Sequence, residues 1–497
     1  MSPAYPELEV RFRRIGALAA AGAMLDWDAA TMMPAGAAEA RIEQLAHLAL
    51  TRQEYLTRPE IGDLLDRAEA ERAGLDAWQA ANLREMRREW RQATALPPDL
   101  VEALTRAANR CELRWRKARP DNDFEGLLPL LEEVLRLTAE KAKALAAATG
   151  RAPYDALLDL YEPGARSAAI DLLFDDLAAF LPGFLARAVE RQARQPQARP
   201  PAGPFPIERQ KALGESLMRE LGFEFERGRL DVSAHPFTGG VPDDVRLTTR
   251  YDEADFTKAL MGVLHETGHG LYELGLPKAW RLQPVGSAPG MALHESQSLL
   301  IEMQLCRSRA FLEFAAPAMR AAFEGIGAEW EPANLARLYQ RVAPGLIRVD
   351  ADEVTYPCHV ILRYRLEKAL LAGDLKLADL PGAWRAGMRD LLGIEPPDDR
   401  DGCLQDIHWP SGAFGYFPTY TMGAIAAAQL FAAAKRQDAA IEPGIARGEF
   451  KPLLAWLRRE VHGRGHLHHT DDLLRLTTGA PLSVEPFKAH LAARYLA

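Results

Sequence analysis

The chain has 497 residues, of which 48% are hydrophobic and 26% are charged, values that are ordinary for a globular protein. Its formal net charge of -9 provides no basic field that would attract nucleic acid or an anionic lipid surface. No apolar stretch approaches the ~20 residues that a membrane span requires. We therefore expect neither a nucleic-acid nor a membrane partner, and two or three domains or one large lobed unit.

Residues 1–195 are predicted to form an N-terminal helical region. Alanine, leucine, arginine and glutamate dominate it, and apolar residues recur at three- and four-residue spacing, as in 130–137. The apolar run 15–25 follows basic residues and resembles a signal peptide. Because acidic residues precede the run and follow it without a clean cleavage site, we expect a helix and no signal.

The four cysteines are far apart and form no CxxC pair, which is typical of reduced, buried thiols. We therefore expect a cytoplasmic protein. Four histidines close to the C-terminus form a His-rich loop that we interpret as a polar turn rather than a metal site: His462, His466, His468 and His469.

A proline-rich stretch at 195–206, with five prolines, is the predicted boundary with the second region, 196–497. Apolar and polar residues alternate over 223–251, which predicts a small antiparallel sheet. The chain is predicted to be helical again from Asp255 onward. The exception is a long irregular segment at 393–419, and such segments tend to be functional. The predicted fold class is mainly α, and both regions are expected to form one continuous unit.

Residues 265–269 read His-Glu-Thr-Gly-His, an H-E-x-x-H motif within a segment that carries a helical apolar stripe. His265 and His269 would lie one turn apart on one face of the helix, where two imidazoles can bind one Zn²⁺ at about 2.0–2.1 Å. Glu266 is rotated away from that face and can take a proton from a metal-bound water.

The alternative is a helix whose two histidines are merely surface residues. That reading leaves Gly268 unexplained, because glycine inside a helix costs about 1 kcal/mol relative to alanine. A second segment that approaches the backbone closely at Gly268 would explain it.

A catalytic zinc needs a third protein ligand and one open position. Glu295, in the sequence His-Glu-Ser-Gln at 294–297, opens a predicted helix and is the first candidate. Glu302 lies on the same helix and is either a competing ligand or a partner that orients one of the imidazoles.

Taken together, these motifs resemble the Taq-type metallocarboxypeptidases, a family also called thermostable carboxypeptidase 1. The resemblance covers nearly the whole chain and rests on motifs in the family's order: Trp27-Asp28, Thr31, Met33-Pro34, Gly36-Ala37 and Arg41 near the start, His235-Pro236-Phe237, Asp244 with Arg246 and Thr248, the residues 265–269 and 294–297, Ile347-Arg348 with Ala351-Asp352, and Gly402 with Gln405-Asp406 and His408-Trp409.

This resemblance implies a two-lobed helical peptidase with a deep active-site groove, similar to neurolysin and angiotensin-converting enzyme, in which 1–195 form part of the groove wall. It implies a homodimeric, metal-dependent carboxypeptidase of broad specificity, with Zn²⁺ or Co²⁺ as the metal and a peptide as the substrate. Glu295 would be the third ligand. Arg348 and His408 would lie toward the closed end of the groove.

A carboxypeptidase must recognise the free carboxylate at the end of a peptide, and the planar fork of arginine matches a carboxylate. Arg348 is the first candidate and Arg246 the second. The alternative for either is an ion pair that holds the lobes together, with Asp350, Asp352 or Asp244.

In the expected reaction, Zn²⁺ polarises the scissile carbonyl, its bound water attacks, and Glu266 moves the proton to the leaving amine. Tyr420 is a candidate donor to the oxyanion, and aromatic packing is its alternative. His235 and His408 are further donor candidates, or else buried packing histidines. The strand near 245–249 could pair with an extended substrate.

Two other functions fit parts of this pattern. An endo-acting oligopeptidase of the neurolysin type would share the zinc chemistry but would need no carboxylate anchor. A non-catalytic zinc scaffold would need no glutamate at position 266 and would close its metal site with a fourth protein ligand.

Overall fold

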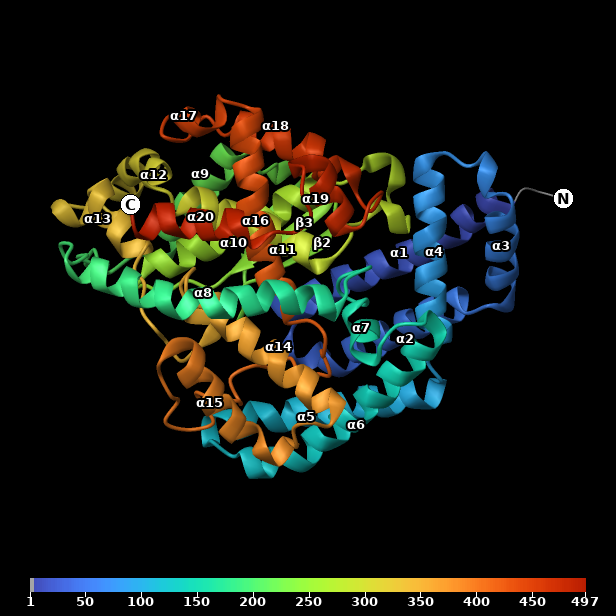
Figure 1. Cartoon of the computed structure of the whole chain (residues 1–497). Coiled ribbons are helices and arrows are strands. Elements are labelled where there is room, and N and C mark those ends of the chain that lie inside the picture. The colour runs from blue at the N-terminus through green and yellow to red at the C-terminus, as the bar shows by residue number, and fades with distance from the viewer. Residues whose placement is uncertain (1–3) are drawn as a thin grey trace.

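Helices make up most of the computed structural model, which describes residues 4–497 (Figure 1). This confirms the predicted mainly α fold class. The N-terminal part contains α1 (Ala4–Thr31), α2 (Ala38–Leu56), α3 (Pro59–Ala70), α4 (Ala77–Thr94), α5 (Pro98–Asp121), α6 (Phe124–Thr149), α7 (Pro153–Leu158) and α8 (Ser167–Ala193). Residues 194–206 are irregular, because prolines supply no backbone N–H and cannot continue a helix.

A second series of helices follows: α9 (Ile207–Leu221), α10 (Phe256–Gly275), α11 (Met291–Leu299), α12 (Arg309–Ala322), α13 (Pro332–Tyr339), α14 (Tyr356–Ala372), α15 (Leu380–Leu392), α16 (Pro418–Gln437), α17 (Ile441–Ile445), α18 (Lys451–Glu460), α19 (Thr470–Thr478) and α20 (Val484–Tyr495). A π-helical segment, Leu300–Cys306, continues α11. Between α15 and α16 the chain is irregular from 393 to 417, close to the predicted bounds.

Local signals explain where these helices begin and end. α6 begins after Asp123, whose carboxylate accepts a hydrogen bond from the Gly126 N–H. It ends at Gly150, whose left-handed backbone (φ 68°) carries no Cβ penalty. The apolar run 15–25 lies inside α1, as the sequence predicts.

The sheet has three strands, β1 (Gly228–Val232), β2 (Thr238–Val241) and β3 (Asp244–Thr249), in the order β1-β3-β2. β2 and β3 form an antiparallel hairpin, whereas β1 pairs with β3 in parallel. The predicted antiparallel sheet is therefore a mixed sheet, and the prediction is wrong for β1.

The loop 233–237 is the reason for the parallel pairing. It crosses the end of β3, where the Ser233 N–H donates to the Thr249 carbonyl and the Thr248 N–H donates to the Phe237 carbonyl. β1 and β2 therefore lie on opposite sides of β3. The buried side chains of β3 pack on α10, which fixes the sheet beside that helix.

α16 lies between two apolar cores. Ile425 and Ala428 belong to a core that joins α6 and α8 to α14, α15 and α20. Ala426, Ala427 and Leu430 belong to a second core around α9, α10, α11 and α12. A helix that is apolar all round is a buried helix, and Figure 1 shows α16 running through the middle of the molecule. The first core draws side chains from both sides of residue 195.

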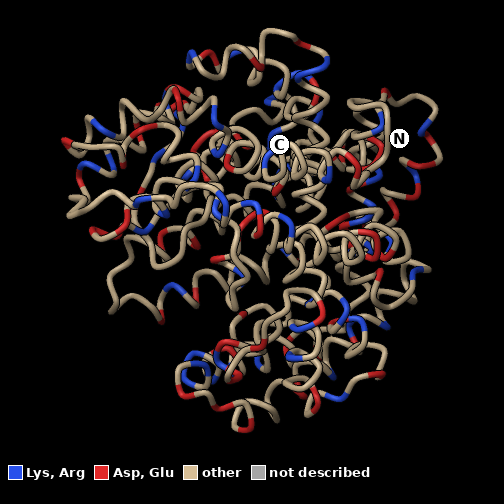
Figure 2. The backbone as a smooth tube through the Cα atoms, turned by 60° about the vertical axis from the view of Figure 1, so that its left-hand side comes forward, with Lys and Arg blue, Asp and Glu red and all other residues tan. Residues whose placement is uncertain are grey.

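Figure 2 shows that charged residues of both signs are interspersed along the backbone. Over the residues that the structure describes, no helix is long and apolar enough to cross a membrane.

Candidate metal centre and active site

α10 presents both histidines of the H-E-x-x-H motif. Its first turn is capped by Asp255, which accepts a hydrogen bond from the Thr257 N–H. The imidazole rings of His265 and His269 lie 5.0 Å apart between centroids, one helical turn from each other. The predicted arrangement on one face of a helix is confirmed.

α11 lies against α10 at Gly268. A Cβ atom on Gly268 would lie 2.4 Å from the Gln297 carbonyl oxygen and 2.6 Å from the Ser298 Cα atom. Glycine is therefore required for the two helices to approach this closely, as the sequence predicts. The contact brings Glu295 of α11 to the two histidines.

Three potential ligand atoms converge at this contact. The Glu295 Oε2 atom lies 3.4 Å from His269 Nε2 and 3.9 Å from His265 Nε2. All three atoms lie within 4.8 Å of one another. Two ligand atoms about 2 Å from a tetrahedral cation lie about 3.3 Å apart, so the spacing suits a divalent metal.

α16 supports Glu295 from the other side. A Cβ atom on Gly423 would lie 2.8 Å from the Glu295 Cβ atom. Ser298 adds a 3.2 Å hydrogen bond from its hydroxyl to Glu295 Oε2. The carboxylate is thus confined by its own helix and by α16.

Glu302 does not point at the cation position, because it holds the other nitrogen of His265. Its Oε2 atom lies 2.9 Å from His265 Nδ1, and its Oε1 atom accepts a 2.6 Å hydrogen bond from Arg307. This contact keeps the His265 Nε2 lone pair free for a metal. Of the two predicted roles for Glu302, the structure supports the orienting one. The carboxylate sits in the π-helical segment 300–306, a geometry that is frequent at functional sites.

The charges around the histidines favour a cation. Burial alone would lower the pKa of His265, but Glu295, Glu302 and Glu266 raise this pKa to about 10. The pKa of His269 is lowered by burial and by the neighbouring imidazoles. Two imidazoles and a carboxylate are the ligand types of a catalytic zinc site. The residues therefore fit a bound divalent metal.

Glu266 is 6% exposed and is held by the sheet. The Thr238 hydroxyl on β2 donates a 2.6 Å hydrogen bond to Glu266 Oε2. Sequence analysis missed Thr238, since a single threonine after a predicted loop carries no signal of its own. β3 has strand partners on both edges, so the expectation that a substrate pairs with 245–249 is wrong.

Arg348 belongs to a buried ion cluster. Its Nε and Nη2 atoms donate to Asp406 Oδ1 at 3.0 and 2.9 Å, and its Nη1 donates to the Tyr356 hydroxyl at 3.1 Å. Arg363 donates to the other Asp406 oxygen at 2.6 Å. Two arginines thus share one carboxylate. The ion-pair partners predicted for Arg348 were wrong, because Asp406 approaches from the irregular segment before α16.

His408 and Tyr420 meet beside this cluster. The distance from His408 Nε2 to the Tyr420 hydroxyl is 3.2 Å, and the Arg348 guanidinium lies 5.0 Å from the centre of the Tyr420 ring. Burial lowers the pKa of His408 to about 4, which leaves the imidazole neutral. The pKa of Tyr420 is raised to about 12, first by burial and in part by the charge of Glu295, so the phenol stays protonated.

The two remaining candidates lie in or near the sheet. Arg246 on β3 makes two hydrogen bonds to Asp244 and stacks on Trp27 of α1, 4.4 Å from the ring centre. The expected ion pair with Asp244 is therefore present, but both residues lie on β3, so it does not hold two lobes together. His235 is exposed in the loop before β2, and its imidazole has no hydrogen-bond partner among residues 4–497. It is not a buried packing histidine.

The His-rich loop is not the polar turn that the sequence predicts, because His462 and His466 are buried. His466 and His469 form a second group with Glu85 of α4. Both oxygens of Glu85 are already paired at 2.7 Å, one with Arg84 and one with Arg88. Two adjacent positive charges disfavour a dication, and we interpret this group as a link between α4 and the C-terminal part.

Comparison with known proteins agrees with this geometry. The family model of the Carboxypeptidase Taq (M32) metallopeptidases matches residues 7–495. The chain belongs to this family. The M32 chain is 41% identical to thermostable carboxypeptidase 1 of Thermus thermophilus over 505 residues, which span 99% of this chain and 98% of that protein.

Solved structures of the M32 family show the same fold. Metallocarboxypeptidase 1 of Trypanosoma cruzi superposes with a TM-score of 0.97 at 41% identity, covering 99% of both chains. An M32 carboxypeptidase from Deinococcus radiodurans superposes with a TM-score of 0.93 at 35% identity, covering 99% of this chain and 98% of that one. The predicted family is confirmed. An M32 metallopeptidase is a metal-dependent carboxypeptidase and uses a divalent cation.

Proposed function

We propose that this M32 enzyme removes the C-terminal residue from peptides with broad side-chain specificity. The metal would be zinc or cobalt, held by His265, His269 and Glu295, with Glu266 as the general base. The observation that carries the proposal is the convergence of three ligand atoms within 4.8 Å: two belong to histidines of α10, which also carries Glu266, and the third belongs to Glu295 of α11.

A divalent cation at this position would act as a Lewis acid and lower the pKa of water. Glu266 would accept the proton of the attacking water and deliver it to the leaving amine. Thr238 engages only Oε2 of the carboxylate, so Oε1 can face the water. This hydrogen bond would hold the base in one orientation.

The carboxylate anchor would be Arg348. Arg348 and Arg363 bring two positive charges and Asp406 brings one negative charge, so the buried cluster has an excess of one positive charge. Arg363 is fully buried, whereas Arg348 keeps 6% of its surface. A peptide carboxylate that pairs with Arg348 would neutralise the cluster, and an amide would not.

Tyr420 and His408 would donate to the oxyanion. Tyr420 stays protonated near neutral pH, and its hydroxyl has a neutral imidazole as its neighbour. Either group can therefore donate to a developing negative charge. Their contact lies on the irregular segment and α16, and α16 also supports Glu295.

Broad specificity would come from the edge of the sheet. β2 is an edge strand, and its Thr238 contacts Glu266, so a substrate backbone can run along β2 beside the base. Hydrogen bonds to a backbone do not discriminate between side chains. Arg246 and His235, on β3 and in the loop before β2, are the further substrate-contact candidates.

The test is the cleavage of one peptide in two forms. We expect the free acid to lose one residue at a time from its C-terminus, detected by mass, and cleavage to stop with a chelator. Amidation of the same peptide should reduce kcat/KM by about 100-fold, because the excess charge at Arg348 has no partner. Equal cleavage of both forms at internal bonds would favour the neurolysin-type endopeptidase instead.

We also propose a cytoplasmic homodimer in which residues 1–195 and 196–497 form one structural unit around the groove. The common core of α6, α8, α14 and α20 supports the single unit. Light scattering at several concentrations measures the oligomeric state directly.

A further inference from the structure

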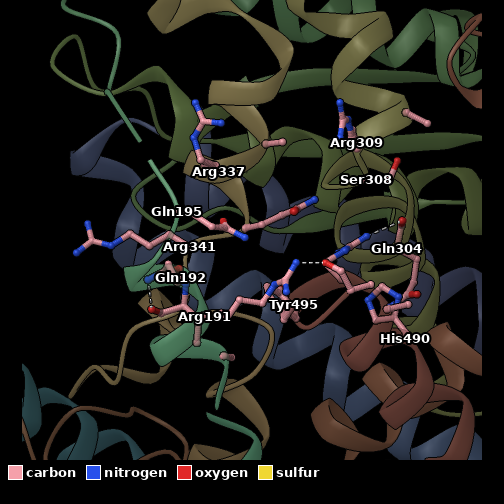
Figure 3. Close-up of a pocket in the computed structure, with 18 of the residues that line it drawn as sticks. Arg191, Gln192, Gln195, Gln304, Ser308, Arg309, Arg337, Arg341, His490 and Tyr495 are labelled. Atoms are coloured by element: carbon pink, nitrogen blue, oxygen red, sulfur yellow. Dashed lines mark hydrogen bonds between the residues drawn. The ribbon is translucent and has the colours of Figure 1, made fainter. Parts of the chain in front are cut away.

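A cavity of about 1580 Å³ lies apart from the metal centre, between the C-terminal end of α8, the helices α12, α13 and α16, and α20. Figure 3 shows Arg309 and Arg337 on one side of it and His490 and Tyr495 on the other. None of the residues assigned above to the metal or to catalysis lines this cavity. It is therefore a separate site.

The cavity collects positive charge on a chain whose net charge is -9. Arg337, Arg341 and Arg436 all line it, and none of them forms an ion pair with any carboxylate among the described residues. A single arginine without an ion-pair partner is common on a protein surface. Three around one cavity give its lining positive charge that no ion pair compensates.

Every other arginine and lysine of the lining has an ion-pair or hydrogen-bond partner. Their partners, with the distances, are Glu313 for Arg309 (3.2 Å), Glu442 for Lys435 (2.9 Å), Glu353 for Arg494 (3.0 Å) and the Ala497 carbonyl oxygen for Arg191. The excess charge therefore comes from the three unpaired arginines.

The first turn of α12 adds a second favourable feature for an anion. Ser308 caps this helix of 14 residues, and Ser308, Arg309 and Ala310 all line the cavity. Backbone N–H groups at a helix N-terminus and the helix dipole both favour negative charge. The cavity thus combines two features that favour an anion, arginine guanidinium groups and a helix N-terminus.

Apolar side chains complete the lining. Phe431 of α16, Ile445 of α17 and Val342 of the loop after α13 face the same cavity. A ligand with both a polyanionic and an organic part can use both kinds of surface. No strand borders the cavity, so a peptide could not bind there by strand addition.

We propose that this cavity binds a small molecule that carries two or more linked phosphate groups, such as a nucleoside diphosphate. Arginine matches phosphate oxygens bidentately, so unpaired arginines around one cavity suit a ligand that carries more than one phosphate. The volume exceeds that of an ordinary small-molecule site, so the cavity has room for a nucleotide.

Titration calorimetry on the metal-loaded full chain tests the proposal. The probes are ADP, adenosine and a C-terminally amidated hexaglutamate peptide, and the metal content is measured before and after each titration. We expect ADP to bind and adenosine to bind at least 10-fold more weakly. The double variant Arg337→Ala/Arg341→Ala should bind ADP about 100-fold more weakly, about 10-fold for each charged hydrogen-bonding group lost.

The matched control is Arg13→Ala/Arg14→Ala. These two exposed arginines of α1 also lack an ion-pair partner within residues 4–497, and their removal changes the net charge equally. ADP affinity should be unchanged in this control. The proposal is wrong if ADP does not bind, if both double variants lose affinity equally, or if the hexaglutamate peptide binds and ADP does not.

Discussion

Thr238 and Glu266 are joined by a 2.6 Å hydrogen bond that links the edge strand β2 to α10, the helix of His265 and His269. The bond spans 28 residues of sequence and fixes one oxygen of the proposed general base. Replacing Thr238 by valine keeps the shape and removes the hydroxyl. We expect kcat/KM to fall about 10-fold, because Glu266 is then free to leave its orientation.

The control for Thr238 is serine, which restores the hydroxyl. Thr238→Ser should recover most of the activity, and metal content measured by atomic spectroscopy should be unchanged in both variants. Equal activity of the valine and wild-type enzymes would show that the sheet does not position the base.

Glu302 and Glu295 should differ in how they affect the metal. Glu302→Gln removes the charged partner of His265 but leaves the three proposed ligands, so we expect metal affinity to fall 10- to 100-fold. Glu295→Gln removes a ligand and should weaken metal binding further. Competition with a chromogenic chelator measures both. The assignment of the two glutamates would be reversed if Glu302→Gln had the greater effect.

Gly268 should not tolerate a side chain. In Gly268→Ala the Cβ atom meets the backbone at Gln297 and Ser298, so α10 and α11 must separate and Glu295 must move away from the histidines. We expect the free energy of unfolding to fall by about 1–3 kcal/mol and metal affinity to fall at least 10-fold.

Gly262, on the same helix, supplies the matched control. A Cβ atom there would contact nothing within 4 Å. Gly262→Ala should therefore leave metal affinity unchanged and stabilise the helix by up to about 1 kcal/mol. Chemical denaturation and the chelator competition measure both variants, and equal effects would contradict the close approach of α10 and α11.

Buried histidines should make the fold sensitive to acid. Burial, aided by the charge of Arg458, lowers the pKa of His462 to about 3 in the folded chain. Below pH ~6.5 the unfolded chain therefore binds a proton at this histidine that the folded chain does not bind. Stability from this group is present above pH ~6.5 and is lost as pH falls. Between pH 7.5 and 5.5 the loss should be about 1 kcal/mol.

His462→Gln tests this pH dependence. Glutamine cannot titrate, so the fall in the free energy of unfolding between pH 7.5 and 5.5 should be about 1 kcal/mol smaller than in the wild type. Urea denaturation at both pH values gives the comparison. An unchanged pH dependence would mean that His462 is not held neutral by its surroundings.

Local sequence was sufficient to place the two histidines proposed as metal ligands and most of the helices. Once the segment is a helix, the spacing of His265 and His269 determines their relative position. The glycine at position 268 predicted that another segment approaches the helix closely there. The resemblance to a family added Glu295, which spacing alone left in competition with Glu302. The histidine spacing, the close contact at Gly268 and the position of Glu295 each involve only one helix or two helices in contact.

The wrong predictions concern contacts between distant parts of the chain. The partner of Arg348 is Asp406, 58 residues away, and no periodicity in the sequence indicates that pairing. His466 looked like a surface residue, but Glu85 of α4 lies 3.5 Å from it. The parallel pairing of β1 depends on where a five-residue loop crosses the sheet, which strand propensity does not encode.

In the proposed mechanism, Glu266 moves the proton at a metal held by His265, His269 and Glu295. The most direct measurement is kcat/KM on a free-acid peptide for Glu266→Gln, together with metal content per chain. We expect activity to fall by at least about three orders of magnitude while the metal stays near one ion per chain. Wild-type activity in the metal-loaded variant would contradict the account.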